Sequence, residues 1–136
     1  MPGTYPAFFM DTVEKLINRL PEEQCEFILH VREILLSAHP EVTEKLHFST
    51  AFISLRGWLA YFNPLESGGL EINFCKGYLL DSEHPELIVR GRKYVRGLVY
   101  NTPADFDEAA FRTILNKIVA FHLQKKKPKA KSNTAI

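Results

Sequence analysis

Apolar residues recur at helical spacing along the first forty positions of the chain. One helix is predicted where they stand three or four positions apart, at Val13, Leu16, Ile17 and Leu20. Asp11 is placed to cap its start. A second helix is predicted to begin at Pro21, where a missing N–H costs nothing, and to stop before Pro40. Its apolar stripe consists of Phe27, Val31, Ile34, Leu35 and Ala38. A third, short helical turn is predicted over residues 41–46.

The period of the pattern changes after His47. Residues 48–55 and 58–65 are rich in aromatic and branched side chains, with Arg56-Gly57 between them, and predict two strands joined by a turn. Ser67-Gly68-Gly69 predicts the next turn. In the third strand apolar and polar residues alternate, in the order Leu70, Glu71, Ile72, Asn73, Phe74 and Cys75. Three strands with short turns predict an antiparallel meander.

The last third of the chain predicts a short helix, a strand and a long helix. The short helix covers residues 85–90 and ends at Gly91, a residue type typical of a left-handed C-cap. The strand covers residues 94–100. Asp105 and Glu108 resemble a capping box before the final helix. One face of that helix holds Phe111, Ile114, Leu115, Ile118 and Val119. The fold class is therefore α+β, with N-terminal helices and a C-terminal helix packed on a curved antiparallel sheet.

Composition fits a single globular domain. Hydrophobic residues make up 46% and charged residues 24% of 136 residues, and no apolar run approaches the ~20 residues that a bilayer requires. We predict one domain over residues 1–124 and a lysine-rich flexible tail over residues 125–136. The first residues lack a cationic and apolar leader, and Cys25 and Cys75 are far apart. Both features favour a cytoplasmic protein with free thiols.

The net charge of +1 hides an asymmetry. Five lysines and no acid lie in residues 125–136, so the remainder holds 12 Lys and Arg against 16 Asp and Glu, a net charge of −4. A domain that binds nucleic acid over a broad face usually has the opposite balance. We therefore expect no broad nucleic-acid binding and no membrane insertion, and any anion site must be local.

The sequence lacks the motifs of several kinds of functional site. The five histidines and two cysteines do not have the spacing of a zinc site, so no metal is predicted. The glycines match no phosphate-binding loop, and no cofactor is predicted. Cys75 is the one candidate nucleophile, because the neighbouring Lys76 would lower its pKa if the two side chains met. Adjacent strand residues point to opposite faces, however, so an inert thiol is the alternative.

The basic run from Arg90 to Arg96 is the strongest candidate site. A strand that begins near Arg92 would place Arg92, Tyr94 and Arg96 on one face, with Lys93 on the other. Two guanidiniums beside an aromatic ring suit a phosphate or a carboxylate. The alternative is that Arg90 complements a helix end and the other cations pair with the acidic excess. The predicted ligand-binding residues are Trp58, Lys76, Arg92, Lys93, Tyr94 and Arg96.

Two motifs also carry a family resemblance. Residues 71–80 and 91–98 pair a Phe-x-Lys-Gly strand end with an Arg-Lys-x-x-Arg strand start, and this pairing resembles the YdhG-like bacterial family of domains of unknown function. The resemblance runs from about Val13 to Val119. It implies a compact α+β fold, distantly frataxin-like or secretion-chaperone-like, in a bacterial cytoplasmic protein without an established activity. It also implies recurrent roles for Lys76, Lys93 and Arg96, and for the aromatic residues Phe52 and Phe74.

Three functional hypotheses remain open at this point. The leading one is a non-enzymatic binding module for a small anionic ligand or an acidic partner segment. The second is a chaperone-like or assembly factor that binds another protein, or a second copy of itself as a homodimer, through its sheet. The third is a thiol-dependent enzyme centred on Cys75.

Overall fold

The computed structural model describes residues 17–47 and 50–124. The tail predicted over residues 125–136 and nearly all of the first predicted helix lie outside the described residues. The elements, in chain order, are α2 Glu22–Leu36, β1 Thr43–His47, β2 Thr50–Ser54, β3 Trp58–Pro64, β4 Leu70–Phe74, the 3₁₀ turn η3 Gly77–Leu80, β5 Arg96–Tyr100, the 3₁₀ turn η4 Pro103–Asp105 and α3 Glu108–Leu123.

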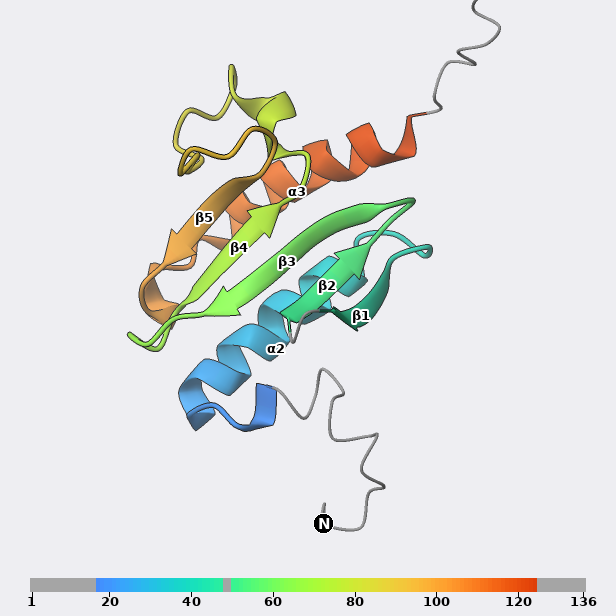
Figure 1. Cartoon of the computed structure of the whole chain (residues 1–136). Helices are drawn as coiled ribbons and strands as arrows, with labels where there is room; N and C mark the ends of the chain where they lie inside the picture. Colours follow the sequence, from blue (N-terminus) through green and yellow to red (C-terminus); the bar gives the residue numbers. More distant parts are fainter. Residues whose placement is uncertain (1–16, 48–49, 125–136) are drawn as a thin grey trace, which may run out of the picture.

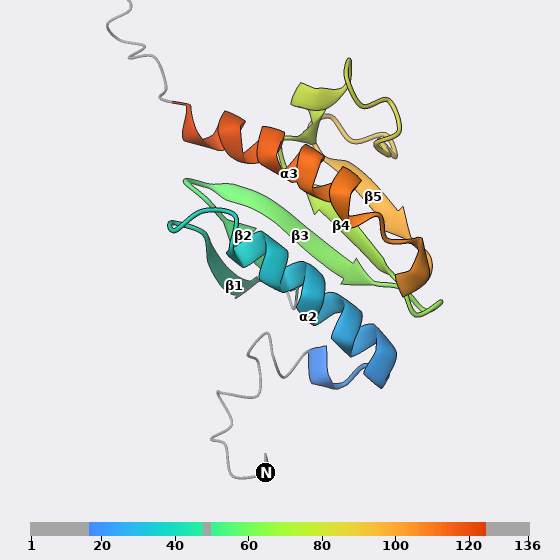
Figure 2. The same cartoon turned by 180° about the vertical axis from the view of Figure 1, so that it is seen from behind.

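The five strands form one open antiparallel sheet in the order β1-β2-β3-β4-β5. Every strand therefore pairs with its neighbour in sequence, as expected for a meander. Helices α2 and α3 lie side by side on one face of the sheet (Figures 1 and 2). The other face, which we call the open face, carries no helix among the described residues. The predicted α+β class is confirmed.

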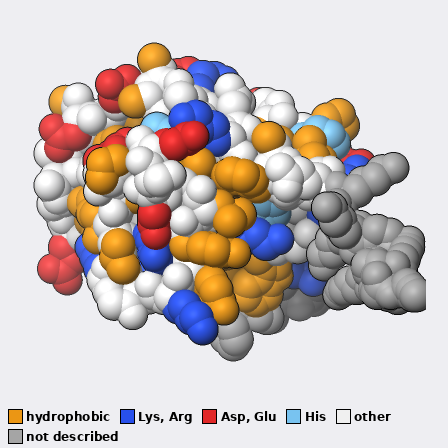
Figure 3. Space-filling view, turned by 90° about the horizontal axis from the view of Figure 1, so that it is seen from above, with side chains coloured by type: hydrophobic (Ala, Val, Ile, Leu, Met, Phe, Trp, Pro, Cys, Tyr) orange, Lys and Arg blue, Asp and Glu red, His pale blue; other side chains and the backbone are white. Residues whose placement is uncertain are grey.

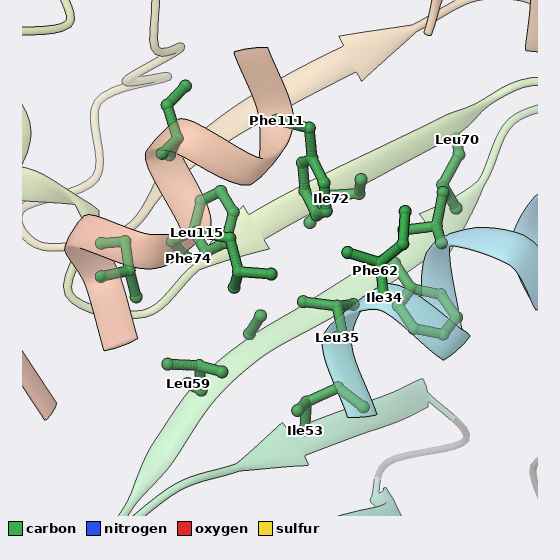
Figure 4. Close-up of a cluster of buried hydrophobic side chains, with 14 of the residues drawn as sticks. Ile34, Leu35, Ile53, Leu59, Phe62, Leu70, Ile72, Phe74, Phe111 and Leu115 are labelled. Carbon is green, nitrogen blue, oxygen red and sulfur yellow. The ribbon is translucent and has the colours of Figure 1, made fainter. Parts of the chain in front are cut away.

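The core lies between the sheet and the two helices. Leu70, Ile72 and Phe74 of β4 are fully buried there. Phe111 and Leu115 of α3 meet them, and the rings of Phe74 and Phe111 stack at 6.1 Å (Figure 4). The alternation in β4 is typical of a half-buried strand, but Glu71 and Asn73 on its other face are buried as well. The apolar faces predicted for both helices are buried at Phe27, Val31, Ile34, Leu35, Phe111, Ile114, Leu115, Ile118 and Val119. Burial of such side chains stabilises the fold by about 1.5–3 kcal/mol each.

Tertiary pairing changes two predicted elements. Residues 41–46 do not form a helical turn, because Thr43–His47 pair with β2 as strand β1. Residues 85–90 do not form a helix either. The connection between β4 and β5 instead begins with η3 and continues without regular structure, and Ile88 forms a bridge to Gly97 of β5. We call this connection, residues 77–95, the β4–β5 loop.

The ends of the helices agree with the sequence to within a residue or two. Pro21 precedes α2 as its N-cap rather than occupying the first helical position. Asp107, not Asp105, caps α3, and its carboxylate accepts a bond of 3.1 Å from the N–H of Ala110. Asp105 instead belongs to a capping box with Thr102 around η4. The predicted box with Glu108 was therefore wrong by two positions.

Candidate functional site: an aromatic and basic end of the sheet

The antiparallel topology brings the predicted site residues to one end of the sheet. Strand β3 begins there with Trp58, β4 ends there just before Lys76, and β5 begins there just after Tyr94. The register supports this placement, since Phe74 lies opposite both Ala60 and Arg96. Figure 3 shows this end, where hydrophobic side chains gather with Lys and Arg among them. We call this surface the sheet end.

Arg96 is buried and serves the fold. It is only 7% exposed, and its Nε and Nη2 donate to both carboxylate oxygens of Asp81 at 2.8 and 3.0 Å. Its Nη1 donates to the backbone oxygens of Arg92 and Val95, each at 2.9 Å. These bonds occupy four N–H groups of the guanidinium. Arg96 therefore holds the β4–β5 loop against the start of β5 and offers little to a ligand.

Arg92 is also committed to the loop. Its guanidinium donates to the backbone oxygens of Val89 and Ile88 at 3.1 and 3.2 Å, and to Oδ1 of Asn73 at 3.0 Å. The predicted shared strand face was wrong, because the strand begins only at Arg96. Arg96 lies opposite Phe74, which faces the helices, whereas Arg92 contacts Asn73 on the open face. The two guanidiniums therefore do not converge on one anion.

Arg90 and Gly91 form a turn and do not end a helix. Both adopt left-handed backbone conformations, with φ of +50° and +71°. The guanidinium of Arg90 lies 3.1 Å from the buried carboxylate of Glu71. The sequence did not predict this pair, since it placed Arg90 at a helix end and assigned ion pairing to the other cations, as Arg96 shows with Asp81. Glu71 and Asn73 therefore form, with Arg90 and Arg92, a polar layer between the open face of β4 and the β4–β5 loop. A buried carboxylate needs such a partner to offset its desolvation.

What remains exposed at the sheet end is apolar and cationic. Tyr94 is 51% and Tyr78 37% exposed, and their rings meet edge to face at 5.2 Å. The Nζ of Lys93 lies 5.4 Å from the centre of the Tyr94 ring, within the range of a cation–π contact. Lys93 and Lys76 are both exposed, and neither has an ion pair with a carboxylate in the described part of the chain.

The β4–β5 loop is rich in exposed apolar residues. Six large hydrophobic side chains are exposed among the described residues, and four of them, Tyr78, Leu79, Val89 and Tyr94, lie in this loop. Such a concentration on a loop is more typical of an interaction surface than of a solvated connection. The predicted ligand-binding residues include Tyr94 but not Tyr78, which follows the Lys-Gly at the end of the third predicted strand.

A β-bulge determines where Trp58 points. Ile53 pairs with Ala60 but Ser54 pairs with Trp58, so Leu59 is the extra residue in β3. Leu59 and Ala60 are both fully buried, whereas Trp58 is 45% exposed and its ring meets that of Phe52 at a tilt, with the ring centres 4.4 Å apart. Without the bulge, strict alternation would turn Trp58 toward the helices along with Ala60. Trp58 therefore joins the open face at the sheet end.

Burial disfavours chemistry at Cys75. It raises the pKa of the thiol to about 11, so the nucleophilic thiolate is scarce near neutral pH. No charged neighbour offsets this effect in the described part of the chain, and the predicted help from Lys76 does not occur. The thiol-dependent enzyme stays a hypothesis, with this thiol held mostly in its protonated form near neutral pH.

His122 is a buried polar residue that the sequence did not single out. It lies in the last turn of α3, where its Nδ1 is 3.0 Å from the backbone oxygen of Leu55. Burial lowers its pKa, the bond to Leu55 opposes that shift, and the charge of Lys76 adds to it. The ring is therefore neutral and donates Nδ1–H to the carbonyl, which ties α3 to the turn between β2 and β3.

Residues 17–47 and 50–124 contain neither a cluster of metal-binding side chains nor a membrane-spanning helix. No group of three or more His, Cys, Asp or Glu side chains in this part of the chain could hold a metal ion. No helix described there is both long and apolar enough to cross a bilayer.

No family model, curated protein or solved structure matches the chain. The resemblance to the YdhG-like family therefore stays a prediction.

Proposed function

We propose that this protein is a non-enzymatic binding module that recognises an acidic segment of a partner protein at the sheet end. The observation that carries the proposal is the pair of exposed tyrosines, Tyr78 and Tyr94, with Lys93 against the Tyr94 ring. Together with Trp58 and Lys76 they offer apolar contact area and positive charge on a domain whose body is net negative.

The interior of the β4–β5 loop supports this assignment. Arg92 and Arg96 fasten the loop to the sheet, so its exposed residues are held in place before a partner arrives. Preorganisation of this kind reduces the entropy lost on binding. The sequence prediction of Lys76, Lys93, Tyr94 and Trp58 as contact residues is kept in the proposal. The roles of Arg92 and Arg96 change from contact to support.

The choice of an acidic segment rests on charge and size. A small anion would need several donors converging on one point, and the two arginines are instead committed to Asp81, Asn73 and backbone oxygens. Exposed lysines beside aromatic rings suit a segment that carries Asp or Glu next to an apolar side chain.

By its sequence motifs we also place the chain among the YdhG-like proteins of the bacterial cytoplasm.

The test uses a defined probe, a fluorescein-labelled peptide Asp-Glu-Leu-Phe-Asp-Glu, and fluorescence anisotropy with the full chain. We expect Tyr94→Ala to weaken binding by about 5- to 30-fold, because aromatic residues at the centre of an interface typically contribute about 1–2 kcal/mol. Lys93→Glu should weaken it about threefold to tenfold at low salt, and less at high salt.

The matched control is Arg19→Glu, which makes the same change of charge at another exposed cation. It should leave peptide binding within about twofold of the unchanged chain, since charge far from an interface acts weakly across a Debye length. Equal losses in Arg19→Glu and Lys93→Glu would mean that net charge alone governs binding. Absence of binding by the unchanged chain would overturn the proposal.

A further inference from the structure

The two edges of the sheet differ in how they are closed. At the β5 edge, Ile88 and Gly97 exchange two backbone hydrogen bonds of 2.8 and 2.9 Å, so the β4–β5 loop covers part of that edge. At the other edge lies β1, which has only β2 beside it in the described part of the chain. An edge strand with open backbone groups is a template for a further strand.

The register of β1 indicates which backbone groups point outward. Hydrogen-bonded and non-bonded pairs alternate along each antiparallel ladder, and a residue that bonds to one neighbouring strand does not bond to the other. Gly97 of β5 bonds outward to Ile88, so its partner Asn73 bonds to Tyr61 of β3. Phe52, opposite Tyr61, therefore bonds to Lys45 of β1. Thr43, Lys45 and His47 therefore bond to β2. The N–H and C=O groups of Glu44 and Leu46 face the open edge.

The side chains of β1 give this edge a chemical preference. Lys45 lies opposite Phe52, whose ring stacks on Tyr61 and meets Trp58 at a tilt on the open face. Lys45 is exposed and has no ion pair with a described carboxylate. Glu44 differs, because its side chain is held by Arg32 of α2, whose Nη2 donates to Oε1 at 2.6 Å. The available charge of the edge is therefore the ammonium of Lys45.

We propose that β1 is a docking edge for an extended acidic segment of another protein, which adds as a sixth, antiparallel strand with Asp or Glu opposite Lys45. The incoming strand would exchange backbone bonds with Glu44 and Leu46. The residue opposite Lys45 would then form a non-hydrogen-bonded pair, in which side chains come closest. A second copy fits less well, because pairing all five residues of β1 with themselves places Lys45 opposite Lys45.

This edge adjoins the sheet end, because Trp58 contacts Phe52 opposite Lys45. The proposed contacts nevertheless differ, since those of the edge lie in β1 and the charge of the sheet end lies at Lys76 and Lys93, so Lys45→Glu and Lys93→Glu test the two proposals separately. The probes are the capped peptide Thr-Val-Thr-Glu-Thr-Val-Thr and its counterpart with Lys at the centre, titrated into the ¹⁵N-labelled full chain. We expect the amide signals of Glu44 and Leu46 to shift, and the Glu peptide to bind about tenfold more tightly than the Lys peptide. Lys45→Glu should invert that preference.

Two controls keep the outcome decisive without disturbing the fold. Methylating the backbone nitrogens of the two residues that flank the central Glu of the peptide removes the two N–H groups that donate to the oxygens of Glu44 and Leu46, and should weaken binding at least about tenfold. Lys93→Glu should leave the preference of the two peptides unchanged. Shifts confined to Lys93 and Tyr94, or the same β1 shifts on raising the concentration of the chain alone, would overturn the proposal.

Discussion

The ion pair between Arg96 and Asp81 should be one of the largest polar contributions to the stability of this domain. The two side chains are 9% and 49% exposed, and the pair is bidentate. Removing one partner of a fully buried pair typically costs about 3–5 kcal/mol, whereas an exposed pair contributes about 0–1 kcal/mol. Because only Arg96 is buried, we expect Asp81→Ala to lower the free energy of unfolding by about 2 kcal/mol.

Asp81→Asn should cost about 1 kcal/mol, because the amide keeps one acceptor for the guanidinium but loses the charge. Urea unfolding followed by circular dichroism measures both variants. The matched control is Glu83→Ala, which removes the nearby exposed pair with Lys117 and should lower the free energy of unfolding much less than Asp81→Ala does.

Asp81→Ala is also measured in a chain that carries Arg96→Met, which distinguishes the loss of the ion pair from other effects of removing the Asp81 side chain. The Arg96→Met variant leaves Asp81 half-exposed and solvated, so adding Asp81→Ala to it should cost almost nothing further. Hydrogen exchange at the amides of Ile88 and Gly97, which bridge the loop to β5, should accelerate in Asp81→Ala. If Asp81→Ala unfolds like Glu83→Ala, or costs the same with and without Arg96, the structural role assigned to Arg96 is refuted.

Three further predictions follow from other buried groups. Because burial raises the pKa of Cys75 to about 11, iodoacetamide should label it more slowly at pH 7 than free cysteine, and faster labelling would contradict its burial. Burial lowers the pKa of His122, so on acidification the unfolded chain binds a proton at a higher pH than the folded chain does. The free energy of unfolding should therefore be unaffected above about pH 6.5 and decrease below it. His122→Gln should make this decrease smaller in urea titrations from pH 7 to 5. A Cβ at Gly69 would lie 1.9 Å from the backbone oxygen of Tyr100, so Gly69→Ala should lower the melting temperature much more than Gly68→Ala, which meets open space and costs about 1–2 kcal/mol of backbone strain; equal effects would refute the close approach.

Local pattern predicted most of the architecture because the repeating elements are stabilised where their own side chains are buried. The alternation of Leu70, Ile72 and Phe74 with polar residues corresponds to the two faces of β4, and the apolar face of α3 is buried as its spacing predicted. Local pattern did not predict the structure of residues 41–46. Their pattern is short, and pairing with β2 rather than local preference makes them a strand.

The candidate site also has features that the sequence predicts and features that depend on the tertiary structure. The sequence located the basic run and its aromatic neighbours, and the meander order determined that they gather at one end of the sheet. The sequence did not predict that Arg96 would pair with Asp81, or that Arg92 would donate to Asn73. Those partners lie 15 and 19 residues away along the chain, in contacts made through an irregular loop.

The sequence by itself therefore determined the fold class, the buried faces of the two helices and of β4, and the segment that carries positive charge. Tertiary structure alone decided which cations are structural and which face solvent, because the availability of a charge depends on burial and on partners distant in sequence. It also decided the direction of Trp58, since one extra residue in β3 reverses the alternation that the sequence predicts. Composition and period are local properties, whereas burial and partnership arise only when the chain has folded.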